Sequence, residues 1–258
     1  QYEHLPQPEI VAVNLKTELY PSTRAYTVEG YYVLKNKTSA PISNIHVQEY
    51  PDDGVKLEHL GLSVANTPDT AHQRFGHCIY VLAQKMLPGD SLKMTFRQTF
   101  TTQRYGMKEA IDIVENGTFF NNDELPSLGY NRQIELSEED DRASYGLPER
   151  PRKPAKDDAF ALRQSNTGTD AHLVRFEMIV GTEKDQTAIA PGDLIDDWTE
   201  ADRRYFHYRM PAPMLHFYAV VTARHDISRE VWSLPDGVLV ALLLYPHSPH
   251  QPPLAPTH

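Results

Sequence analysis

The feature that most restricts the fold of this chain is an alternation of apolar and polar residues with a period of two. In the segment 10–19 the apolar residues fall on one side and the polar ones on the other: Val11, Val13, Leu15 and Leu19 against Asn14, Lys16 and Glu18. The segment 92–100 repeats the pattern, with Leu92, Met94, Phe96 and Phe100 against Lys93, Thr95, Arg97 and Thr99. Strands of this kind present one face to a core and the other to water. They are typical of packed antiparallel sheets.

Similar signals continue along the chain, bounded by turn residues. We expect further strands at 26–36, 45–50, 57–64, 77–82, 173–180, 205–210, 215–223 and 238–245. The first three strands are joined by short turns, which predicts an antiparallel meander. Acidic residues after Ser137 and a glycine at Gly146 predict a short helix between them. A surface connection rich in Pro, Lys and Arg follows at 148–158.

These signals predict an all-β fold: an antiparallel β-sandwich, or saddle-like sheets, with an irregular and partly helical excursion in the middle. We expect one domain over 1–258, made of a first meander (1–128), an irregular and helical connection (129–172), returning strands (173–246) and a Pro-rich linker (247–258). A chain of 258 residues is long enough to bury a core of this kind.

Composition excludes several classes of partner. The formal net charge of −10 argues against nucleic acid and against an anionic lipid surface, since both need a basic face. The single cysteine, Cys78, forms no internal disulfide and is expected to be a small buried side chain. No stretch reaches the length of about 20 apolar residues that spans a bilayer. The N-terminus has no signal-peptide pattern, so we expect either a soluble domain or part of a longer chain.

The motifs of catalysis are missing. A zinc peptidase helix needs His-Glu-x-x-His, which does not occur here. The nearest histidine pair, His247 and His250, is interrupted by Pro249 and cannot share a helix face, while His216 and His225 are too far apart to chelate locally. We find neither a phosphate-binding glycine loop nor a nucleophile elbow. The sequence therefore predicts no catalytic residue, no metal site and no cofactor within this chain.

Two longer stretches are more informative. The first combines 176–180 (Phe-Glu-Met-Ile-Val), 188–192 (Ala-Ile-Ala-Pro-Gly), 205–208 (Tyr-Phe-His-Tyr) and 210–220 (Met-Pro-Ala-Pro-Met-Leu-His-Phe-Tyr-Ala-Val). In this order they resemble the end of the N-terminal β domain of aminopeptidase N-like zinc metallopeptidases, which are gluzincins. The second stretch joins 114–122 (Val-Glu-Asn-Gly-Thr-Phe-Phe-Asn-Asn) to 125–130 (Leu-Pro-Ser-Leu-Gly-Tyr). It resembles the bacterial subgroup that is fused to a permease of the ABC-transporter type.

The resemblance implies a non-catalytic N-terminal domain that packs on a catalytic peptidase domain of the same chain and closes one side of its peptide-binding cavity. The zinc ligands belong to that next domain, so zinc is expected in the parent protein. In the family, a loop corresponding to 120–124 supplies a polar side chain near the free amine of the substrate. Asn121, Asn122 and Glu124 are the candidates here, and a carboxylate such as Glu124 pairs well with the ammonium of a peptide N-terminus.

The subgroup adds two expectations of its own. The parent protein would carry a membrane permease portion in the bacterial inner membrane, and this domain would be soluble and periplasmic. Two alternatives remain open. One is a free-standing β-sandwich interaction module, which predicts no large apolar docking patch. The other is a β-sandwich hydrolase whose distant residues converge in a pocket.

Overall fold

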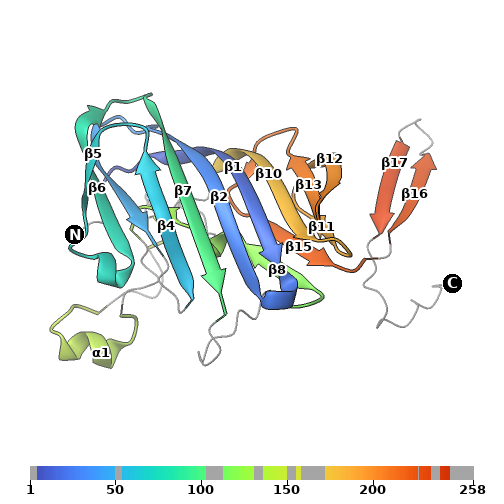
Figure 1. Cartoon of the computed structure of the whole chain (residues 1–258). Helices are drawn as coiled ribbons and strands as arrows, with labels where there is room; N and C mark the ends of the chain where they lie inside the picture. Colours follow the sequence, from blue (N-terminus) through green and yellow to red (C-terminus); the bar gives the residue numbers. More distant parts are fainter. Residues whose placement is uncertain are drawn as a thin grey trace.

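The computed structural model describes residues 5–49, 54–102, 113–130, 136–149, 155–157, 172–225, 227–233 and 239–244, with backbone alone at 229, 230 and 239–244. Its main element is an eight-stranded sheet in the order β12-β13-β10-β1-β2-β7-β4, with β14 paired to β10 (Figure 1). The bounds of its strands are β1 Glu9–Tyr20, β2 Ala25–Lys35, β4 Val55–Leu62, β7 Ser91–Thr101, β10 Leu173–Glu183, β12 Asp193–Glu200, β13 Arg203–Arg209 and β14 Met214–Leu215.

Three smaller sheets and a few short helices complete the described part of the chain. A four-stranded sheet has the order β5 (Asn66–Asp69), β6 (His77–Met86), β3 (Ile42–Gln48) and β9 (Ser127–Leu128). A three-stranded sheet has the order β11 (Thr187–Ile189), β15 (Ala219–Ala223) and β8 (Thr118–Asn121). A hairpin joins β16 (Ser228–Ser233) to β17 (Leu239–Leu244) and stands apart from the rest (Figure 1). The helices are α1 Glu139–Ser144 and the 3-10 turns η1 Pro21–Thr23, η2 Gln73–Phe75 and η3 Asn122–Glu124.

The core lies between the inner face of the large sheet and the two sheets that cover it. Alternate residues of β1, β2, β7 and β10 are buried there, as the period-two pattern predicts. The ring of Tyr26 from β2 contacts Phe120 of β8 with 4.9 Å between centroids. The ring of Phe176 from β10 contacts Tyr218 at 4.8 Å. Side chains of both layers therefore interlock, and the expected all-β class is confirmed.

The connections differ from the expected meander in two ways. After β2 the chain leaves the large sheet, so β3 pairs with β6 and β9, while the second neighbour of β2 is β7. The large sheet is also not wholly antiparallel, because β1 pairs in parallel with β10. A strand pattern gives the faces of a strand but not its neighbours, so the expected three-strand meander was wrong. The division of the chain at 128, 172 and 246 stays a prediction.

A local irregularity changes one inward residue. The register of β1 against β2 shifts between Ile10 and Ala12. This bulge turns Ile10 fully into the core and leaves Val11 half-buried, although the alternation had placed Val11 inward. From Val13 onward the expected faces hold.

Other local expectations are confirmed. Helix α1 ends at Ser144 and is closed, as predicted, by Gly146, which has a φ of 64° and whose N–H donates to the carbonyl of Ala143. Cys78 is buried, and burial raises the pKa of its thiol. Among the described residues, none of the helices has the length and apolar character that crossing a membrane requires. The Pro-rich linker at 247–258, with His247 and His250, lies outside the described residues.

Candidate functional site

The predicted substrate-facing residues lie together at the end of the three-stranded sheet. Asn121 closes β8, and Asn122 and Glu124 form η3 directly after it. The side chain of Asn121 accepts a hydrogen bond from the N–H of Asp123 at 2.9 Å and so caps η3. The structure therefore brings the three residues into one tight turn, and it gives Asn121 a local structural role.

Asn122 connects this turn to a distant part of the chain. Its Oδ1 accepts from the N–H of Tyr218 at 2.9 Å, and its Nδ2 donates to the carbonyl of His216 at 3.3 Å. Its own N–H donates to the carbonyl of Tyr218 at 3.1 Å. Both ends of the side-chain amide are thus engaged with the main chain before β15. Asn122 therefore holds the loop against the main chain at His216 and Tyr218.

Gln98 was missed by the sequence reasoning and holds the same loop from the opposite side. It faces inward on β7, is 3% exposed, and its Nε2 donates both to the hydroxyl of Tyr26 at 2.8 Å and to the carbonyl of Glu124 at 2.6 Å. A sequence signal existed, because Gln98 is a polar residue at an inward position between Phe96 and Phe100. A buried amide on an apolar face needs a fixed partner, and here that partner is the loop.

An apolar outer face continues from this loop across the three-stranded sheet. Phe119, Val221 and Ile189 lie directly opposite one another on β8, β15 and β11 and point the same way. Burial alternates along 217–222, so Phe217, just before β15, is also turned outward. Phe119 is 47% exposed and Phe217 49%. We call Phe119, Val221, Ile189 and Phe217 the apolar outer face.

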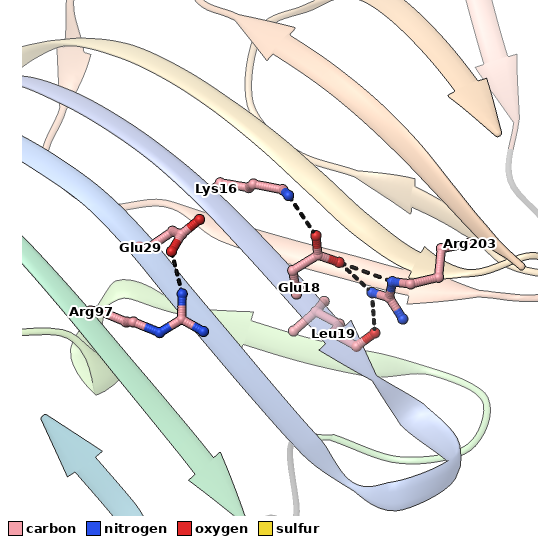
Figure 2. Close-up of polar contacts among 6 residues, drawn as sticks. All are labelled: Lys16, Glu18, Leu19, Glu29, Arg97 and Arg203. Carbon is pink, nitrogen blue, oxygen red and sulfur yellow. Dashed lines mark hydrogen bonds and ion pairs between the residues drawn. The ribbon is translucent and has the colours of Figure 1, made fainter. Parts of the chain in front are cut away.

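The outer face of the large sheet has the opposite character. Figure 2 shows Glu18 between Lys16 and Arg203, with Glu29 paired to Arg97 on the neighbouring strands. Arg203 donates to Glu18 Oε2 at 2.6 Å from Nη2 and also to the carbonyl of Leu19 at 3.0 Å. The hydrogen bond to Glu18 raises the pKa of Lys16. Charges paired across strands in this way are typical of a face that stays in water.

The described residues do not fit a zinc site. Among them, no group of three or more His, Cys, Asp or Glu side chains is arranged to hold a metal ion. The buried histidines that lie closest together, His46 and His77, bind each other and Gln48 rather than a set of carboxylates. The described residues therefore supply no set of ligands for a metal-dependent step.

Comparison with known proteins gives similarity in fold. No protein-family model and no curated protein matches the sequence. In structure, 96% of the chain is similar to an M1 zinc metallopeptidase from Deinococcus radiodurans bound to a Tyr-Ser-Ala substrate, with a TM-score of 0.58 and 9% identity. Aminopeptidase A of Legionella pneumophila, in complex with aspartic acid, is similar over 95% of the chain, with a TM-score of 0.55 and 10% identity.

The chain spans 50% of the Deinococcus protein and 24% of the Legionella protein. A two-domain M1 zinc metallopeptidase bound to L-tryptophan is similar over 92% of the chain and 47% of its own length, with a TM-score of 0.54 and 8% identity. The resemblance in fold to the N-terminal β domain of M1 aminopeptidases is thus confirmed. At this level of identity the likeness concerns the fold alone.

Proposed function

We propose that this chain is the non-catalytic β domain of an M1-type zinc aminopeptidase and that it docks on the catalytic domain through the apolar outer face. The observation that carries the proposal is this face. Phe119 on β8 and Phe217 just before β15 are each about half exposed, and Val221 and Ile189 extend the face across the neighbouring strands. Apolar side chains gathered in this way are typical of a surface that another domain covers. The solved structures with similar folds indicate the class of the partner, which is a catalytic zinc peptidase domain. Zinc, the catalytic residues and the hydrolytic step belong to the partner domain.

The same observation favours docking over a free-standing interaction module. For such a module we predicted no large apolar patch, whereas the apolar outer face, with Phe119 and Phe217, lies beside the loop with Glu124. The charged outer face of the large sheet supplies the water-exposed side that a domain docked by its other layer requires.

A mutational test of docking uses matched aromatic residues. The gene is first read onward from this segment for His-Glu-x-x-His, and the catalytic domain is made as a separate polypeptide. We expect Phe119→Asp with Phe217→Asp to weaken its binding to this chain by about a hundredfold. Each substitution places a charge where the docked domains would bury an aromatic side chain. Isothermal titration calorimetry measures the affinity. The control is Phe75→Asp, which changes a 58% exposed phenylalanine on η2 and should bind like the unaltered chain. Equal binding by all three proteins would disprove docking through this face.

The loop predicts a substrate contact in the assembled enzyme. We propose that the carboxylate of Glu124 binds the ammonium group of the peptide N-terminus, held there by Gln98 and Asn122. Glu124→Gln should lower kcat/KM for an aminoacyl reporter substrate about tenfold, mostly by raising KM, because a charged pair becomes a neutral hydrogen bond. Asp123→Asn removes the neighbouring charge and serves as the control. A loss of the same size in both variants would assign the effect to overall charge.

The proposal extends to the location of the parent protein. The resemblance of 114–130 to the permease-fused subgroup supports a protein of the bacterial inner membrane, with this domain in the periplasm and the permease portion in the same chain. Fusion of a cleavable tag to the domain, followed by protease treatment of spheroplasts and of lysed cells, tests this location. Cleavage in spheroplasts is expected, and protection until lysis would contradict it.

A further inference from the structure

A pair of buried histidines lies under the segment that follows the substrate-facing loop. His46 on β3 is 2% exposed and His77 on β6 is 5% exposed. His46 Nδ1 and His77 Nε2 are 3.0 Å apart, and His77 Nδ1 lies 3.4 Å from Gln48 Oε1. The proposed function uses none of these groups.

The hydrogen bonds fix where the protons lie. Gln48 donates from Nε2 to the carbonyls of Glu49 and Phe75, so its Oε1 faces His77 as an acceptor. His77 Nδ1 therefore carries hydrogen, and His77 Nε2 is left to accept from His46 Nδ1–H. A proton added to His77 Nε2 would set two N–H groups against each other across 3.0 Å. The hydrogen bond between the two rings therefore requires His77 Nε2 to be without hydrogen.

The surroundings also disfavour a charge. Burial, with His77 as the second cause, lowers the pKa of His46 to about 4. Burial lowers the pKa of His77 as well, with His72 as the second cause. On the same face of the sheet, Asp69 of β5 lies opposite Ile79, and its carboxylate accepts from the N–H of Ala71.

The remaining titratable neighbours lie elsewhere around the pair. Residues at alternate positions of the two strands point to the other face, which places Cys78 and Tyr80 there, with Glu49 directly after β3. Burial raises the pKa of all three groups, so each is neutral more readily than in water. Tyr130 contacts the ring of His77 in an edge-on arrangement.

The pair is connected to the loop through β9. Val47 and Gln48 of β3 pair with Leu128 and Ser127, and the N–H of Gly129 donates to the carbonyl of His46 at 2.9 Å. The segment 127–130 is therefore held against β3 by main-chain hydrogen bonds, and its Tyr130 contacts the ring of His77 on β6. It begins three residues after Glu124, so its position limits the freedom of η3.

We propose that the His46–His77 pair is an acid-sensitive latch, whose protonation releases the segment 127–130 from β3 and β6 and loosens the loop that carries Glu124. The consequence for substrate binding rests on the proposed function, whereas the opening itself does not. Because the closed state holds neutral rings, its stability is complete above the ordinary histidine pKa of 6.5. That stability declines as the pH falls from 6.5 toward 4.

Hydrogen exchange on this chain tests the latch. Exchange of the segment 122–130 is followed by mass spectrometry at pH 7 and pH 5, with each rate divided by the intrinsic rate at that pH. For a group with a pKa of about 4 when closed and 6.5 when open, protection should fall about 20-fold between pH 7 and pH 5. His46→Asn with His77→Gln keeps a donor and an acceptor at the facing positions but does not titrate in this range, so protection should stay constant. His59→Gln removes an exposed histidine and should behave like the unaltered protein.

Two results would overturn the latch: constant protection in the unaltered protein, or an equal fall in the double variant, which retains Asp123 and Glu124. If the double variant does not fold, an NMR titration of the unaltered histidines decides. Both rings should stay neutral with hydrogen on Nδ1 at pH 6, and should titrate together with the loss of protection at 127–130. Titration of either ring near 6.5 with the segment still protected would contradict the proposal. Neither measurement needs the catalytic domain, so failed docking leaves the latch intact, and the reverse also holds.

Discussion

Replacing Gly30 with alanine is expected to lower the free energy of unfolding by about 4 kcal/mol, the largest effect that we predict for a single methyl group in this chain. Gly30 lies in the middle of β2, opposite Leu15 of β1 and Phe96 of β7, and has a φ of 152°. A Cβ atom there would collide with the carbonyl oxygen of Asn14 and would lie 2.9 Å from the Cα of Leu15. Neither atom can move without breaking the pairing of β1 with β2, so strain and collision add.

The matched control is Gly89→Ala in the turn between β6 and β7. Gly89 also has a positive φ, of 90°, but a Cβ atom there would meet nothing within 4 Å. Its replacement should cost about 1 kcal/mol, from backbone strain alone. Urea unfolding followed by circular dichroism measures both variants, and the melting temperature of Gly30→Ala should fall by on the order of 10 °C. Similar losses for the two variants would show that β1 and β2 yield around the new methyl group.

The strands that could be predicted from the sequence are those with one face exposed to water and the other buried in the core. The alternation located β1 and β7 within a residue or two, because burial on one side selects side chains at every second position. Strand β12 was missed, since nearly all of Asp193–Glu200 is exposed and its sequence has no apolar side to detect. The parallel pairing of β1 with β10 was also beyond reach, because it joins residues more than 160 positions apart and leaves no local mark.

The candidate site shows the same limit. Sequence resemblance located the loop 120–124, but the partners of Asn122 lie 94 and 96 residues away. An asparagine in a turn that is held by a distant main chain has the same local sequence as one that faces a substrate. Gln98 could have been found, since it interrupts an apolar face, and its position implies a buried polar partner. Which partner it has depends on how the layers pack.

The second large effect concerns Asn122, whose replacement by leucine should lower the free energy of unfolding by about 3 kcal/mol. The change leaves the N–H of Tyr218 and the carbonyl of His216 without the amide that bridges them to η3. Tyr218 is 2% exposed, and water has little access to these groups once leucine covers them. Each loss of a hydrogen-bond partner in a buried place therefore approaches the full cost of desolvation.

The control is Asn121→Ala, which removes one exposed capping bond and should cost about 1 kcal/mol. Urea unfolding of this chain alone measures both variants without any catalytic partner. This separation matters for the site, because Asn122→Leu would also displace Glu124 and reduce activity in an assembled enzyme. A large loss of stability in the isolated chain shows that Asn122 holds the loop in place through its hydrogen bonds. Unchanged stability together with reduced activity would instead indicate that Asn122 contacts the substrate. Glu124 would then no longer be the preferred contact for the amine.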